Sequence, residues 1–207
     1  MSSQRNAIID AALNSYRDGG FAAVSFRRVA QAVGISHMQP YRYFSDKQAL
    51  MAAMRARCFE HLITLIKAAH QPHQTPLQAL YSITAGTFGY LFEHPQQYRL
   101  MFSLNQPPVD QYPELKAVRE QVYQHIKQLI ADAVAVGEMH GDPDEIMHLA
   151  WAMSHGLYTL HISHQLMHGK TLEQLIQPAM ATIFAPLTHS DDLDALQRAA
   201  QPPEKQQ

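Results

Sequence analysis

The chain has 207 residues, 46% of them hydrophobic, which is enough to bury a core. It lacks an apolar run long enough to cross a membrane and the apolar segment of a signal peptide, and its single cysteine, Cys58, excludes an internal disulfide. The net charge of −2 divides into +5 over residues 1–57 and −7 over the remainder. We therefore expect a cytoplasmic protein whose basic head binds a polyanion, with ordinary surface charge as the alternative.

Apolar residues recur at helical spacing in the first third of the chain. The helices expected there are one ending at Asp18-Gly19-Gly20, a second from the Ser25 cap to Gly34, a third beginning at Ser36, and a fourth from Asp46 to about Ala69. Gln39 is predicted to complete a capping box with Ser36. Pro40 follows in the first turn, where a proline is least harmful, so an α-helix with a distorted start is expected.

The same spacing continues through the rest of the chain, interrupted at prolines and glycines. Further helices are expected over 76–93, 98–104, 113–136, 144–168 and 171–187. No segment alternates with a period of two for long enough to predict a strand. The fold class is therefore all-α with about nine helices, divided into a head (1–54), a body (55–189) and a frayed polar tail (190–207).

Two short helices joined by the turn Val33-Gly34-Ile35-Ser36 predict a helix-turn-helix. The second helix of this motif enters the major groove of DNA, so its exposed face must carry donors, acceptors and flat apolar groups. The residues able to supply that face are His37, Met38, Gln39, Arg42 and Tyr43. The residues expected to anchor the helix to its neighbours are Ile35, Phe44 and Leu50.

The run GGFAAVSFRRVAQAVGISHMQPYRYFSDKQAL resembles the DNA-binding domain of TetR-family transcriptional regulators, and the likeness extends from about Gln4 to Met54. The matching positions are Ala11-Ala12, Gly20-Phe21, Ser25, Arg27, Val29-Ala30, Gly34-Ile35-Ser36, Tyr41, Phe44, Lys47 and Leu50. The resemblance implies phosphate contacts from Ser25, Arg27, Tyr41 and Lys47. It implies base and nearby backbone contacts from His37, Met38, Gln39, Arg42 and Tyr43. Arg28 and Ser36 complete the predicted DNA-binding set. The alternatives are a solvated charge for Arg28, simple capping for Ser25 and Ser36, and core packing for Tyr41.

The resemblance also implies a helical body that binds a small effector and dimerises through its last two helices, here about 144–168 and 171–187. The segments LAWAMSHGLYTL and HPQQYRLMF look like a subgroup with a tryptophan-histidine-glycine element. The candidate effector contacts, for each of which plain core packing is the alternative, are Tyr81, Phe88, Phe92, Met101, Phe102, Tyr123, Trp151 and His155. Their low charge favours an apolar or aromatic effector.

The other function classes find less support in the sequence. His161, His164 and His168 have the spacing of one helix face that could bind a transition metal, but a polar surface or a dimer contact is the favoured interpretation. No catalytic motif is present, so neither an enzyme nor a cofactor is expected. The expected function is that of a ligand-responsive repressor that binds a palindromic DNA operator as a homodimer, without membrane association. The alternative is a helical ligand-binding or protein-interaction module without DNA binding.

Overall fold

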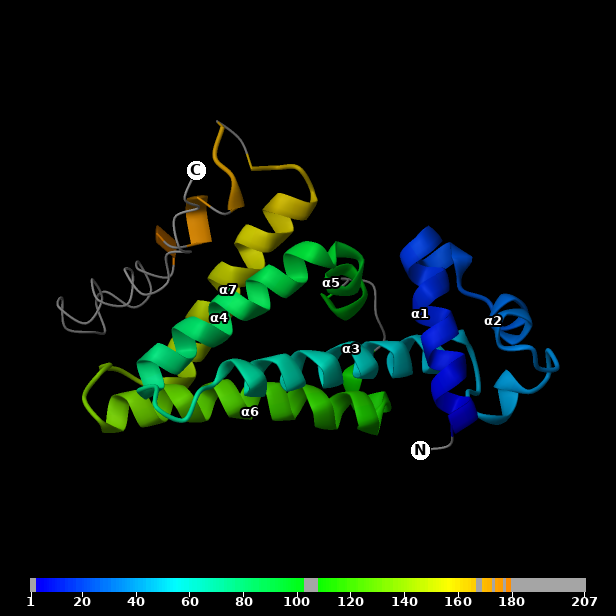
Figure 1. The fold of residues 1–207 in the computed structure, drawn as a ribbon, viewed down its shortest axis with the longest axis horizontal. Helices are drawn as coiled ribbons and strands as arrows, with labels where there is room; N and C mark the ends of the chain where they lie inside the picture. The colour runs from blue at the N-terminus through cyan, green and yellow to red at the C-terminus, as the bar shows by residue number, and fades with distance from the viewer. Residues whose placement is uncertain (1–2, 103–107, 167–168, 173, 177, 180–207) are drawn as a thin grey trace. The chain divides into compact units, whose positions relative to one another are not determined.

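The computed structural model describes residues 3–102, 108–166, 169–172, 174–176 and 178–179. Over these residues the chain forms α-helices and short 3-10 helices and no strand, which confirms the all-α prediction (Figure 1). The elements are α1 (Ser3–Ala23), α2 (Phe26–Val33), η1 (Pro40–Arg42), α3 (Lys47–Ala69), α4 (Pro76–Glu93), α5 (Pro95–Phe102), η2 (Val109–Gln111), α6 (Pro113–Ala135) and α7 (Pro143–Ile162).

These elements belong to two compact units. The first unit contains Met1–Thr64 and Gly89–Val122, and the second contains Leu65–Phe88 and Tyr123–Gln207. The division passes through α3, α4 and α6, so each of these helices contributes to both units. The domain boundary predicted after residue 54 falls within α3, inside the first unit.

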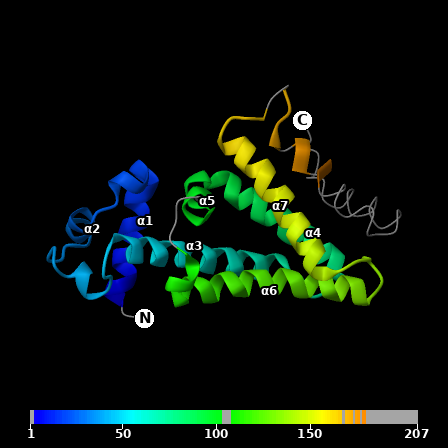
Figure 2. The same cartoon turned by 180° about the vertical axis from the view of Figure 1, so that it is seen from behind.

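In the first unit, α1 packs beside α2, as both views of the ribbon show (Figure 1 and Figure 2). Ile8 of α1, Val29 of α2 and Leu50 of α3 are fully buried. Each such side chain contributes about 1.5–3 kcal/mol of stability through its removal from water. The predicted break in α1 is present: Gly20 has a φ of 63°, in the left-handed region that glycine adopts without strain.

The predicted third helix is not an α-helix. Only Pro40–Arg42 are helical between α2 and α3, and they form a 3-10 turn. The Arg42 amide donates to the Gln39 carbonyl at 3.1 Å and the Tyr43 amide to the Pro40 carbonyl at 3.0 Å, both across three residues. Pro40 has no amide hydrogen, so the first bond of an α-helical ladder that begins at Ser36, from residue 40 to the Ser36 carbonyl, cannot form.

The predicted capping box between Ser36 and Gln39 is also absent. The Ser36 hydroxyl accepts only a long hydrogen bond, 3.4 Å, from the Met38 amide. The Gln39 side chain donates instead to Gln4 of α1. The fourth predicted helix does begin as expected, because Asp46 Oδ1 accepts from the Ala49 amide at 2.8 Å and so caps α3.

In the second unit, α7 begins at a well-formed cap, where Asp142 accepts from the Asp144 and Glu145 amides. The helix ends at Ile162, earlier than the predicted residue 168, and His164 has a φ of 55°. His161 and His164 therefore do not share a helix face as predicted, and His168 lies outside the described residues. Residues 172, 174–176, 178 and 179 are helical, and the rest of the predicted final helix, 180–187, also lies outside them.

Candidate nucleic-acid interface

The α2 helix is capped at both ends as the sequence predicts. Ser25 Oγ accepts from the Arg28 amide at 3.3 Å. Gly34 has a φ of 72°, and its amide donates to the Gln31 carbonyl at 3.2 Å. These caps fix α2 and turn the chain sharply toward residues 36–42.

An aromatic contact joins α2 to η1. The Phe26 and Tyr41 rings meet edge to face, with their centroids 4.4 Å apart. Together with Arg27 and His37 they line an open hollow of about 310 Å³. Tyr41 is nonetheless 52% exposed, so core packing, the alternative for this residue, does not account for it.

The predicted DNA-binding residues differ in their exposure. The exposed ones are Arg27, Arg28, Ser36, His37, Met38, Tyr41 and Arg42. The partly buried ones are Ser25, Gln39, Tyr43 and Lys47. The exposed set comes from the first turn of α2 and from residues 36–42. It combines guanidinium, imidazole, hydroxyl and thioether groups, which can contact phosphates and base edges.

Gln4 is a positioning residue that the sequence did not single out. Its side-chain oxygen accepts from Gln39 Nε2 and from the Tyr43 hydroxyl, each at 3.0 Å. These bonds direct Gln39 and Tyr43 toward α1. They also tether the turn around η1 to the first helix. A glutamine at position 4 carries no signal of this role in the sequence alone, because its partners lie 35 and 39 residues away.

Lys47 is held at the start of α3. Its ammonium donates to the Phe21 carbonyl at 2.7 Å and lies 3.8 Å from the centre of the Phe21 ring. Partial burial lowers the pKa of Lys47 from its ordinary value. The contact places a cation at the junction of α1 and α3, close to the turn that ends α1.

The basic charge of residues 1–57 is not all available to a polyanion. Arg55 is buried, and Arg57 pairs with Asp10 at 3.0 Å and with Glu60 at 3.2 Å. Within the described part of the chain, Arg27, Arg28 and Arg42 form no ion pair. The charge that can meet a polyanion is therefore concentrated beside the hollow.

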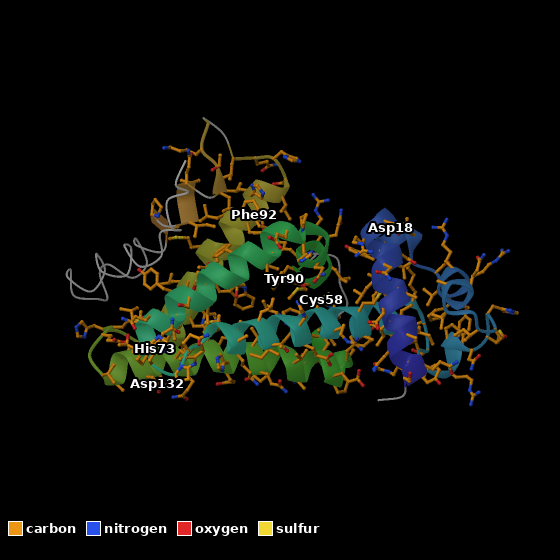
Figure 3. All side chains as sticks on the ribbon, in the orientation of Figure 1. Asp18, Cys58, His73, Tyr90, Phe92 and Asp132 are labelled. Atoms are coloured by element: carbon orange, nitrogen blue, oxygen red, sulfur yellow. The ribbon has the colours of Figure 1, made fainter. Side chains whose placement is uncertain are left out.

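The predicted effector contacts fall into both units. In the first unit are Phe92, Met101 and Phe102; Figure 3 labels Phe92 near the end of α4. Met101 is buried, and the Phe102 ring meets Phe59 edge to face at 5.6 Å. The ring contact joins α3 to α5.

In the second unit are Tyr81, Phe88, Tyr123, Trp151 and His155. Tyr81 and Phe88 are buried, and burial lowers the pKa of His155. Tyr123 donates to Asp144 at 2.7 Å, while Trp151 is 40% exposed. Trp151 thus lies on an accessible face of α7.

Cys58 and Tyr90, both labelled in Figure 3, belong to a buried part of the first unit. Burial raises the pKa of the Cys58 thiol to about 12, and burial together with the nearby thiol raises that of Tyr90 to about 12. Both shifts favour the protonated form, as is usual for a buried cysteine. The described residues contain no group of three or more histidine, cysteine, aspartate or glutamate side chains that could hold a metal ion.

Comparisons with known proteins agree with this geometry. Residues 8–54 match the family described as bacterial regulatory proteins, tetR family, and residues 80–183 match the tetracyclin repressor-like, C-terminal domain. The HTH-type transcriptional regulator RutR of Escherichia coli O157:H7 is 26% identical over 155 residues, which cover 73% of this chain and 72% of RutR. No helix among the described residues is long and apolar enough to cross a membrane.

Two solved structures show the same fold. A protein of unknown function from Rhodococcus sp. RHA1 superimposes with a TM-score of 0.78 at 21% identity, covering 91% of this chain and 97% of that one. The transcriptional regulator FadR from Bacillus subtilis, in complex with stearoyl-CoA, superimposes with a TM-score of 0.72 at 14% identity, covering 87% and 97%. At these identities the likeness concerns the fold.

Proposed function

The chain belongs to the TetR family of bacterial regulatory proteins, and from that premise we propose that it is a ligand-responsive repressor that binds a palindromic DNA operator as a homodimer. The observation that carries the DNA-binding part is the hollow beside α2, which Phe26, Arg27, His37 and Tyr41 line, together with the exposure of Arg28 in α2 and Arg42 in η1. The exposed guanidinium groups can neutralise phosphates, and the neighbouring side chains can contact base edges.

Within this surface we distinguish residues that contact phosphates from residues that contact bases in the groove. Arg27, Arg28 and Lys47 lie at helix starts and supply phosphate contacts, with Ser25 and the Tyr41 hydroxyl beside them. Ser36, His37, Met38 and Arg42 are exposed in the turn and in η1, where they reach the groove. Gln39 and Tyr43 read the groove only if their bonds to Gln4 rearrange on DNA, so we assign them first to holding the turn in place.

The short reading segment is the observation that favours the alternative, a helical module without DNA binding. A 3-10 turn of three residues presents fewer side chains to a groove than an α-helix does. Against this alternative, the side chains on either side of the turn remain exposed and basic. DNA binding by the purified protein decides between the two.

Dimerisation is supported by α7. Leu149, Ala152, Gly156 and Leu160 recur at helical spacing and are all exposed in the single chain. A Cβ at Gly156 would meet nothing within 4 Å, so this face is open to another helix. An apolar stripe with small residues suits close packing against a second copy, and a two-fold dimer matches a palindromic site.

The test is selection of genomic fragments with the purified full-length protein, followed by footprinting at two salt concentrations. A protected palindrome whose affinity falls steeply with salt is the expected result. No enrichment over random fragments, both before and after refolding from denaturant, would instead favour the module without DNA binding, since refolding removes any co-purified ligand.

A further inference from the structure

Arg55 is the one buried charged residue among the described residues of the core. Its side chain, on α3, is only 6% exposed. Nη2 donates to the Met101 carbonyl of α5 at 3.2 Å, while Nε is buried and has no acceptor within the described chain. A buried guanidinium with an unfilled donor is unfavourable unless an acceptor or an anion completes it.

A second arginine contacts Phe59, which lies four residues, or about one helical turn, after Arg55 on α3. Arg119 of α6 has its guanidinium carbon 5.7 Å from the centre of the Phe59 ring of α3. Burial and then the positive charge of Arg119 lower the pKa of Arg55 to about 10, and Tyr112 opposes them. Arg119 is only partly buried, but its charge acts on a buried guanidinium, and an anion beside both would relieve the repulsion.

The described carboxylates do not supply that partner. Among the residues placed in the structure, none forms an ion pair with Arg55 or Arg119. Other arginines of the same unit do find one, since Arg5 pairs with Glu114 and Arg57 pairs with Asp10. Over the residues that the structure describes, the exposed Arg27, Arg28 and Arg42 also lack an ion pair, but water solvates their charge, whereas Arg55 is buried where α3 meets α5.

We propose that Arg55 and Arg119 bind the oxyanion of the effector, a carboxylate in the first instance, whose apolar or aromatic part contacts Phe59 and Phe102. A planar guanidinium pairs with a carboxylate or a phosphate through parallel hydrogen bonds. The adjacent rings, 5.6 Å apart and edge to face, offer the apolar contact. The inference rests on the proposed function, because it gives the chemical class of the ligand to which the regulator responds.

The position of Arg55 also provides a link to DNA. Arg55 and Lys47 lie on the same helix, α3, about 12 Å apart along its axis at 1.5 Å per residue. An oxyanion held between Arg55 and Arg119 would fix α3 against α6. The bound oxyanion would thereby favour one position of the N-terminal end of α3, which carries Lys47. Allosteric coupling requires that a ligand bind one conformation more tightly than another, and this contact would meet that requirement.

The experiment uses the full-length protein with benzoate, octanoate and phenyl phosphate, each beside a neutral analogue (benzyl alcohol or octanol), at constant ionic strength. Thermal unfolding and calorimetric titration are measured for the wild type and for Arg55→Met, Arg119→Met and the matched surface control Arg17→Met. We expect at least one oxyanion to raise the wild-type Tm while the neutral analogues do not. Tighter binding of phenyl phosphate than of the carboxylates would identify the anionic group of the effector as a phosphate.

The variants separate a binding role from a structural one. Arg55→Met and Arg119→Met should weaken oxyanion binding roughly tenfold or more, whereas Arg17→Met should bind like the wild type. Without ligand, Arg55→Met should unfold at a higher temperature than the wild type, because a buried uncompensated charge has been replaced by an apolar chain of similar length.

The proposal is overturned if no oxyanion raises the wild-type Tm at millimolar concentration, or if both variants retain the response. A lower Tm for ligand-free Arg55→Met would show that Arg55 stabilises the fold through its hydrogen bond to the Met101 carbonyl. If that variant does not fold, Arg119→Met alone decides the question. Footprinting of the wild type in parallel keeps the two proposals distinct, since an operator bound without any oxyanion response refutes only this inference.

Discussion

The rings of Phe26 and Tyr41 meet edge to face at 4.4 Å, and this contact fixes η1 to α2. Phe26 is the first residue of α2 and Tyr41 the middle residue of η1. The contact uses the body of the Tyr41 ring and leaves the side chain half exposed. A three-residue 3-10 turn has little stability of its own, so the aromatic contact and the Gln4 bonds hold it in place.

Replacing Tyr41 by phenylalanine should separate packing from DNA contact. The ring contact with Phe26 is retained, so the free energy of unfolding should change by less than about 0.5 kcal/mol. Loss of the hydroxyl should weaken binding to every DNA sequence by a similar factor. Fluorescence anisotropy on operator and random duplexes measures this. A change confined to the operator would show that the hydroxyl reads a base.

Lys47→Ala tests the cation at the start of α3. We expect weaker binding to all DNA and a decrease of about one in the slope of log affinity against log salt, because one phosphate contact is lost. Arg17→Ala, at an exposed arginine outside the proposed surface, is the control and should leave the slope unchanged. An unchanged slope in Lys47→Ala would show that Lys47 contacts no phosphate and that its role is the hydrogen bond to the Phe21 carbonyl.

Gln39→Ala tests the assignment of this residue to holding the turn. Loss of its hydrogen bond to Gln4 should lower the free energy of unfolding by about 0.5–1.5 kcal/mol, measured by urea denaturation. Gln4→Ala should lower the free energy of unfolding by more, because Gln4 also accepts from the Tyr43 hydroxyl. The double variant should be less than additive because Gln4 and Gln39 share one bond. A change in operator preference for Gln39→Ala but not for Gln4→Ala would instead make Gln39 a base reader.

The stability of the second unit should depend on pH through His125. Its Nε2 is buried without a partner, and burial, then His70 and Lys67, lower its pKa below the ordinary 6.5. The folded state therefore resists protonation, and the unfolded state binds more protons below pH 6.5. Stability is fully present above that value and decreases as the pH falls toward the folded pKa.

His125→Gln should reduce this pH dependence. Urea denaturation of the wild type between about pH 7.5 and pH 5.5 should show stability falling with pH, and the variant should show a shallower fall. His73→Gln, at an exposed histidine labelled in Figure 3, is the control and should follow the wild type. Equal slopes for His125→Gln and the wild type would remove His125 as the cause.

Leu149→Glu tests the proposed dimer face on α7. Leu149 is 63% exposed in the single chain, so a carboxylate there should cost the monomer little. Buried against a second copy, the same charge would oppose association. Sedimentation velocity should show a dimer for the wild type and a monomer for the variant, which should also lose the two-fold footprint. A dimeric Leu149→Glu would place the interface elsewhere.

The sequence alone determined the helical fold and most helix ends, and it predicted the residues of a DNA-binding surface. The signals for helices and their ends are local: helical spacing, proline and glycine breaks, and caps such as Ser25, Gly34 and Asp46. Local signals depend on residues close in the sequence, so they can be recognised without knowing which distant segments pack together. The prediction of a third α-helix was wrong, also for a local reason. Pro40 disrupts the backbone hydrogen bonds of an α-helix more than the prediction allowed.

Only the tertiary structure decided which charges and polar groups are available. Arg55 and Arg42 are both arginines of a basic head in the sequence, yet one is buried beside Arg119 and the other is exposed. The Gln4 contacts likewise join residues more than thirty positions apart. Burial and long-range hydrogen bonds depend on which segments pack together, and a single sequence does not encode that in any short pattern.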